Sequence, residues 1–181
     1  MKRTLSILLV SLITVGAIAQ KYVPVDEGSR VHFTIKNLGI NTGGSFQGLT
    51  GSIVFDPANL GGSSFQVSLD AKTVNTDIEL RDEHLRGEEY LDVAAYPVIT
   101  FQSMQVTRSN SARYLYMFGT ITIRGVTKEV KFPFKATAQG DGYLFEGQFK
   151  LNRRDFGVGG SSLTLSDELN VSLSVFARKA N

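Results

Sequence analysis

Apolar residues recur at every second position along most of this chain, between residues 31 and 177. That period is typical of β-strands with one buried and one exposed face, because successive side chains of a strand point to opposite sides. Helical spacing is scarce, so the sequence predicts an all-β fold. The alternating segments are residues 31–35, 49–55, 65–71, 99–101, 117–123, 130–136, 143–151 and 169–177.

Short turn sequences between these segments indicate antiparallel pairing. Residues 109–111 and 140–142 are typical of tight hairpins, and Gly61-Gly62 and Gly125 mark further reversals. Eight antiparallel strands lose their free edges when they close into a barrel, which encloses either packed side chains or one small ligand. We therefore expect an antiparallel eight-stranded barrel. A sandwich of two four-stranded sheets shows the same alternation and is the alternative.

Residues 1–19 have the pattern of a secretory signal peptide. A basic start, an apolar run over residues 5–15 and the small residues Ala17 and Ala19 follow one another. The apolar run is shorter than the ~20 residues of a membrane span. We expect cleavage near Ala19, a mature domain of residues 20–181 without a stable membrane span, and a periplasmic or secreted location.

Charge and cysteine content exclude several classes of function. Without Lys2 and Arg3 of the signal, the 19 basic residues become 17, equal to the 17 acidic ones. A neutral domain gives no support for nucleic-acid binding, which uses a clustered basic face. The chain has no cysteine, which excludes disulfides, thiol nucleophiles and thiolate metal sites.

Residues 75–90, NTDIELRDEHLRGEEY, interrupt the alternation. Thr76 and Glu79 have the spacing of a capping box, which starts a helix. We predict a short helix and loop over residues 77–90 that cap one end of the barrel. Its apolar side would carry Ile78 and Leu85, and its charged side would face solvent.

Two histidines raise the question of catalysis or metal binding. His84 lies near Asp82, but residues two apart on a helix do not face each other, and no nucleophile elbow accompanies them. His32 is predicted to point outward from its strand, so a site built on both histidines would need residues from opposite surfaces. We expect no catalytic residues, no metal site and no cofactor.

Phenylalanine dominates the inward positions. The chain has twelve phenylalanines and no tryptophan. Inward aromatic rings either fill a core or line a deep apolar cavity, and periodicity alone does not separate the two. The phenylalanines at inward positions are Phe33, Phe55, Phe65, Phe101, Phe132, Phe134, Phe145 and Phe149.

One inward position is charged. Arg153 continues the inward series of Phe149 and Leu151. A buried guanidinium is costly unless it is paired, so Arg153 either bonds an acid such as Asp155 or binds the polar head of a ligand. On these residues, structural pairing is the favoured interpretation.

Five sequence motifs resemble those of the YceI-like family, whose members are exported lipocalin-like barrels that bind polyisoprenoid lipids. The resemblance covers almost the whole predicted mature chain. The motifs are VDEGSRVHFTIKNLG at 25–39, RDEHL at 81–85, EEYLDVAAYPVITFQS at 88–103, GTITIRGVTKEVKF at 119–132 and NRRDFGV at 152–158.

The resemblance implies an interior tunnel for an isoprenoid tail, with the polar head near the mouth. Arg153 and Arg81 are the expected head-group residues. The inward positions that we expect to contact the tail are Phe33, Ile35, Phe55, Val67, Leu69, Leu85, Phe101, Ile121, Phe132, Phe134, Phe149 and Leu151.

The resulting hypothesis is a non-enzymatic exported carrier, or sequestering protein, for a quinone or polyprenyl phosphate type of lipid. Two alternatives from other classes stay open: a structural or stress-response interaction module with a filled core, and an enzyme that acts on an isoprenoid. A homodimer is also an open alternative, because an exposed barrel edge or mouth can pair.

Overall fold

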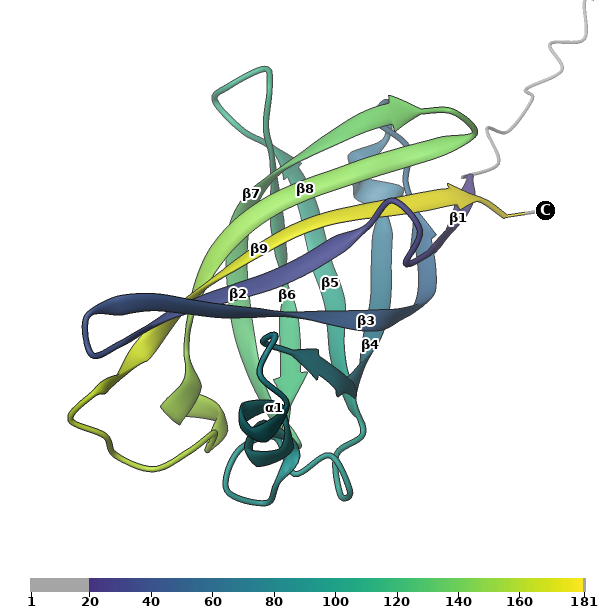
Figure 1. Ribbon diagram of the computed structural model, residues 1–181. Coiled ribbons are helices and arrows are strands. Elements are labelled where there is room, and N and C mark those ends of the chain that lie inside the picture. Colours follow the sequence, from purple (N-terminus) through teal and green to yellow (C-terminus); the bar gives the residue numbers. More distant parts are fainter. Residues whose placement is uncertain (1–19, 181) are drawn as a thin grey trace, which may run out of the picture.

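Nine antiparallel strands form one continuous sheet in the computed structural model, which describes residues 20–180 (Figure 1). The predicted signal peptide therefore lies outside the described residues. The strands are β1 (Lys21–Pro24), β2 (Arg30–Asn37), β3 (Ile40–Val54), β4 (Ser64–Asn75), β5 (Val98–Arg108), β6 (Leu115–Ile123), β7 (Val126–Gln139), β8 (Gly142–Asn152) and β9 (Leu165–Lys179). The helices are η1 (Leu60–Gly62), α1 (Glu79–Arg86) and η2 (Arg153–Phe156).

The sheet closes into an eight-stranded barrel. Each strand from β2 to β9 pairs with the next one in sequence, and β9 pairs back to β2. This confirms the predicted barrel and excludes the sandwich. The ninth strand, β1, was not predicted because it has only four residues, and it pairs with the ends of β3 and β9.

Two hairpins turn through residues in the left-handed conformation. Leu38 and Gly39 connect β2 to β3 with φ angles of 52° and 77°, and Arg124 and Gly125 connect β6 to β7 with 49° and 71°. Two-residue turns of this kind match the twist of the flanking strands. The reversal predicted at Gly125 is thereby confirmed.

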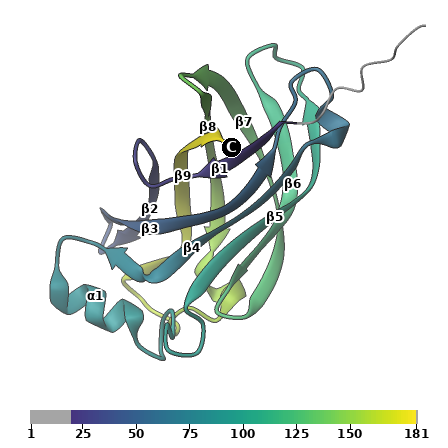
Figure 2. The ribbon, with the colours of Figure 1, turned by 90° about the vertical axis from the view of Figure 1, so that its right-hand side faces the viewer.

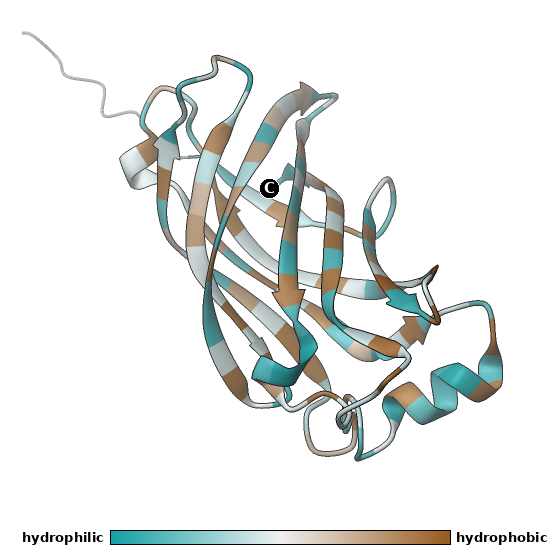
Figure 3. Cartoon of the chain, turned by 90° about the vertical axis from the view of Figure 1, so that its left-hand side faces the viewer, coloured by the Kyte–Doolittle hydropathy of each residue, from teal (hydrophilic) through white to brown (hydrophobic). Residues whose placement is uncertain are grey.

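The barrel interior is packed at one end by aromatic rings. Figure 3 shows apolar and polar residues alternating along the strands, so that one face of each strand points inward. At the end where β1 lies, the ring of Phe55 is 5.3 Å from that of Phe145 and 5.1 Å from that of Tyr143. Phe65 lies 5.1 Å from Phe145. These edge-on contacts close that end of the barrel.

The helix α1 lies across the opposite end of the barrel, as Figures 1 and 2 show. The predicted helix and its capping position are confirmed, but the capping box is wrong. The helix begins after Ile78 without a side-chain cap. The Thr76 hydroxyl instead donates to Asp82, and so does the Thr76 backbone N–H, at 2.9 Å.

The charges of α1 attach the helix to the barrel. The charged side of the helix was expected to face solvent, but Asp82 on it is only 3% exposed, and its carboxylate accepts hydrogen bonds from Thr76, which directly follows β4. Arg81 donates from Nη2 to the Thr76 carbonyl oxygen at 2.7 Å, and Arg86 donates from Nε to the Lys72 carbonyl oxygen at 3.0 Å. Ile78, expected on the inner side of the helix, is exposed.

Candidate ligand-binding cavity

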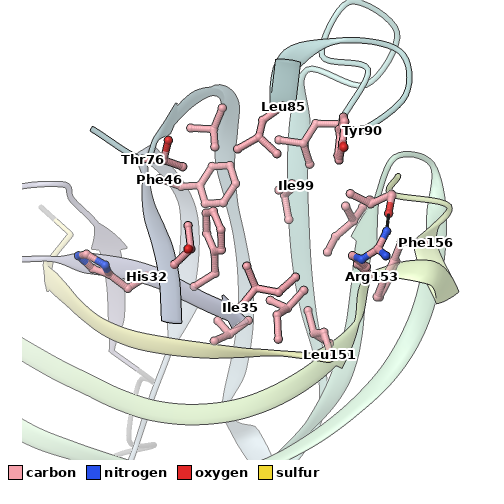
Figure 4. A pocket seen from close by; sticks show the side chains of 18 of the residues that line it. His32, Ile35, Phe46, Thr76, Leu85, Tyr90, Ile99, Leu151, Arg153 and Phe156 are labelled. Carbon is pink, nitrogen blue, oxygen red and sulfur yellow. Dashed lines mark hydrogen bonds between the residues drawn. The ribbon is translucent and has the colours of Figure 1, made fainter. Parts of the chain in front are cut away.

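An apolar cavity of about 310 Å³ lies beneath α1 at the open end of the barrel. We call it the outer cavity. Figure 4 shows Ile35, Ile99 and Leu151 facing this space from the strands, and Leu85 and Tyr90 facing it from α1 and the loop that follows. Its volume is at the lower end of the ~300–1,000 Å³ typical of small-molecule sites.

A smaller cavity of about 130 Å³ lies deeper in the barrel, between the outer cavity and the aromatic end. We call it the inner cavity. Phe101, Phe132 and Phe149 line it. Five aliphatic residues border both cavities, so these side chains lie between the two spaces; we call them the shared ring. These residues are Val31, Leu69, Ile99, Ile121 and Val171.

Some of the inward phenylalanines therefore fill the core and others line a cavity, the two interpretations that periodicity left open. Phe55 and Phe145 pack in the aromatic cluster at the β1 end. Phe33 and Phe149 point inward but stay only half-buried, because they face the cavities. One half of the barrel has a filled core, and the other half is hollow.

Eleven of the twelve residues expected to contact a tail line one or both cavities. Phe55 lines neither. The outer cavity is bordered by Phe33, Ile35, Leu85 and Leu151, the inner cavity by Val67, Phe101, Phe132, Phe134 and Phe149, and both by Leu69 and Ile121.

Several cavity residues were not foreseen. Phe46 and Val74 lie where bulges change the register of β3 and β4, so counting by twos fails there. Tyr90 and Leu91 follow α1, and Phe156 lies in η2, where no strand period applies. The sequence signal shared by the last three was their place inside the family-like motifs.

Arg153 is buried and held by the protein itself. It is 4% exposed. Its Nη1 donates to the carbonyl oxygens of Val158 and Gly160, both at 2.9 Å, and its Nε donates to that of Ser166 at 3.0 Å. Its Nη2 bonds Asp167 at 2.6 Å.

The acid that pairs with Arg153 is thus Asp167 rather than the expected Asp155. Four of the five guanidinium N–H groups are used in this way. Arg153 still borders the outer cavity, but its hydrogen bonds chiefly fix the loop that connects β8 to β9.

Arg81 borders the outer cavity from α1 and has more donor capacity available. Its Nε donates to the Thr76 hydroxyl at 2.8 Å and its Nη2 to the Thr76 carbonyl oxygen. Within residues 20–180, no hydrogen bond involves Nη1. A half-buried guanidinium with unused N–H groups beside an apolar cavity can bind a carbonyl or phosphate group.

Both histidines border the outer cavity, contrary to the expectation that they would lie on opposite surfaces. His32 is exposed, as the alternation predicts, but α1 brings His84 over the same opening. Among the described residues, no three histidine, aspartate or glutamate side chains are grouped to hold a metal ion. In the same part of the chain, no helix is long and apolar enough to cross a membrane.

A closed antiparallel barrel with an apolar cavity at one end defines a class of small barrels that can enclose one ligand. Within that class, the family model of the YceI-like domain matches residues 22–177, and the chain belongs to this family. A UPF0312 protein of Pseudomonas aeruginosa is 34% identical over 187 residues, which cover 97% of each chain.

Two solved structures share the fold. BcnA of Burkholderia cenocepacia has a TM-score of 0.78 and 23% identity, over 83% of this chain and 96% of BcnA. A polyisoprenoid-binding domain of Saccharophagus degradans, implicated in plant cell wall breakdown, has a TM-score of 0.68 and 16% identity. That match covers 90% of this chain and all of the domain, 100%.

Proposed function

We propose that this protein is an exported carrier or sequestering protein whose outer and inner cavities receive the tail of a polyisoprenoid lipid. The observation that carries the proposal is the outer cavity, which is apolar inside and has the charged Arg81 among its border residues. An apolar tail with a single polar head matches that distribution.

Further support comes from the family. The related fold from Saccharophagus degradans is described as a polyisoprenoid-binding domain, and the predicted signal at residues 1–19 supports export. A filled-core interaction module is less suited to a barrel that is hollow at one end. Catalysis has no comparable support, because Asp82, two residues before His84, accepts hydrogen bonds from Thr76 instead.

Affinity should increase with tail length until the cavities are full. Each buried methylene contributes about 0.8 kcal/mol, and ordering a flexible side chain offsets about 0.5–1.5 kcal/mol. An isoprene unit adds five carbons, so the balance favours the longer tail, and we expect at least roughly tenfold tighter binding for each unit from geraniol to farnesol to geranylgeraniol. Isothermal titration calorimetry on the signal-free protein, delipidated beforehand, measures the series.

Equal affinities across this series would contradict a tail-binding cavity. Linear alcohols of the same carbon number are the matched ligands. They bury similar apolar area without methyl branches, so a preference for the branched series shows that the shape of the cavity matters as well as its hydrophobicity.

Arg81 should favour an anionic head group. Replacing Arg81 with glutamine removes the charge at the cavity, and a charge-assisted hydrogen bond contributes about 1.5–3 kcal/mol. We expect farnesyl phosphate to bind at least roughly tenfold more weakly and farnesol to bind almost as before. Arg86→Gln is the matched control, because Arg86 also attaches α1 to the barrel, through the Lys72 carbonyl oxygen, but does not border the cavity. Equal losses in both variants would assign Arg81 a purely structural role.

A further inference from the structure

Three large aliphatic side chains are exposed together at the open end of the barrel. Leu38 and Ile40 lie at the tip of the β2–β3 hairpin and are 73% and 71% exposed, and Leu163, in the loop before β9, is 106% exposed. The two loops are in contact, since the Leu38 N–H donates to the Thr164 carbonyl oxygen at 2.9 Å. We call Leu38, Ile40 and Leu163 the apolar rim.

The apolar rim is continuous with the outer cavity. Asn37 and Leu165 pair across β2 and β9, and both border the cavity. Leu38 directly follows Asn37, and Leu163 precedes Leu165 by two residues. A molecule that enters or leaves the cavity on this side therefore passes beside three exposed aliphatic groups.

The backbone conformation of Leu38 is a second sign that its exposed side chain contacts something outside the protein. Its φ angle is 52°, in the left-handed region. Asparagine or glycine is the usual residue at this position of such a hairpin, and a leucine there is strained. Because the side chain is exposed, no packing inside the barrel offsets that strain. The leucine is explained if its side chain has an apolar environment outside the protein.

The charges around the rim do not oppose a lipid surface. Asp167 is paired with Arg153 at 2.6 Å, and Glu168 is paired with Lys150 at 2.7 Å. Lys36, two residues before Leu38, is exposed. A long basic side chain beside exposed aliphatic groups can bond lipid phosphates while the aliphatic groups enter the acyl region.

We propose that the apolar rim docks on a lipid bilayer and places the mouth of the outer cavity against it. An isoprenoid tail then passes between bilayer and cavity without crossing water. The rim acts as a shallow, reversible contact, since three side chains bury little area. The transfer of a tail rests on the proposed function, but the docking on the bilayer does not require a bound isoprenoid.

The test is flotation of the signal-free protein with neutral phosphatidylcholine vesicles that contain no isoprenoid. The variant carries Leu38→Asn, Ile40→Thr and Leu163→Ser together. We expect the fraction bound to vesicles to fall at least roughly tenfold, because binding scales with the apolar area inserted. The thermal midpoint of Leu38→Asn alone should equal or exceed that of the wild type, because asparagine suits the turn.

A matched control removes an exposed apolar side chain away from the mouth. Met104 is exposed on β5, in the half of that strand remote from α1, and Met104→Thr should leave flotation unchanged. Farnesol titration in vesicle-free solution is measured in parallel for all variants. Unchanged farnesol binding with lost flotation supports docking by the rim.

Three results would overturn the proposal. The first is wild-type protein that does not float, and the second is a triple variant that floats as well as the wild type. The third is an equal loss of flotation with Met104→Thr. Each would show that the apolar rim does not bind the membrane. If flotation depends on the rim but farnesol does not bind to any form, the docking stands and the proposed lipid-carrier function fails.

Discussion

Replacing Arg153 with methionine should lower the free energy of unfolding by about 1–3 kcal/mol, the usual cost when hydrogen-bond acceptors lose a donor inside the protein. Methionine fills much of the same space but donates no hydrogen bond. The carbonyl oxygens of Ser166, Val158 and Gly160 would lose the guanidinium N–H groups that now donate to them. The loss of these donors is the main expected cost, because the three hydrogen bonds are partly shielded from water.

Urea unfolding followed by circular dichroism measures this effect. Arg154→Met is the matched control, because Arg154 is the next residue of η2 and is exposed. Its replacement should change stability by less than about 0.5 kcal/mol. If Arg153→Met is as stable as Arg154→Met but has lost affinity for farnesyl phosphate, Arg153 is a head-group residue and its network is not a stabilising one.

The strands were predictable because alternation is a local property. In any strand with one face inside the barrel, apolar side chains repeat every two residues, so each strand from β2 to β9 was recognisable from the sequence. The closure between β2 and β9 is not local, since a sandwich has the same pattern. β1 is too short to show a period, although it covers the ends of β3 and β9.

The division of the interior could not be read from the sequence. The alternation assigns Phe55 and Phe149 equivalent inward positions, yet Phe55, which directly follows β3, packs against Tyr143, and Phe149 lines the inner cavity. Which rings meet depends on strand tilt and on bulges in β3. Asp82 illustrates the same limit, because the position of its hydrogen-bond partner Thr76, directly after β4, is set by the fold.

Replacing Val67 with tryptophan should shorten the tail that the barrel accepts. Val67 lies on β4 opposite Phe101 and borders the inner cavity but not the outer one. The indole is larger than the valine side chain and would occupy much of the inner cavity. A short tail still fits the outer cavity, so geraniol should bind almost as it does to the wild type.

Longer tails should then lose the contribution of their terminal units. Geranylgeraniol is expected to bind on the order of a hundredfold more weakly to the Val67→Trp variant, since about 0.8 kcal/mol is forfeited for each methylene left outside. His84→Ala is the control: it alters an exposed residue at the mouth and should leave both alcohols nearly unaffected.

The difference between the two alcohols separates a blocked cavity from a damaged fold. Overpacking can cost about 1–3 kcal/mol of stability, which would weaken all ligands together if the barrel opened. Selective loss of geranylgeraniol means that the tail passes the shared ring, the residues that border both cavities, and reaches the inner one. Unchanged binding of both alcohols would confine the tail to the outer cavity, beneath α1.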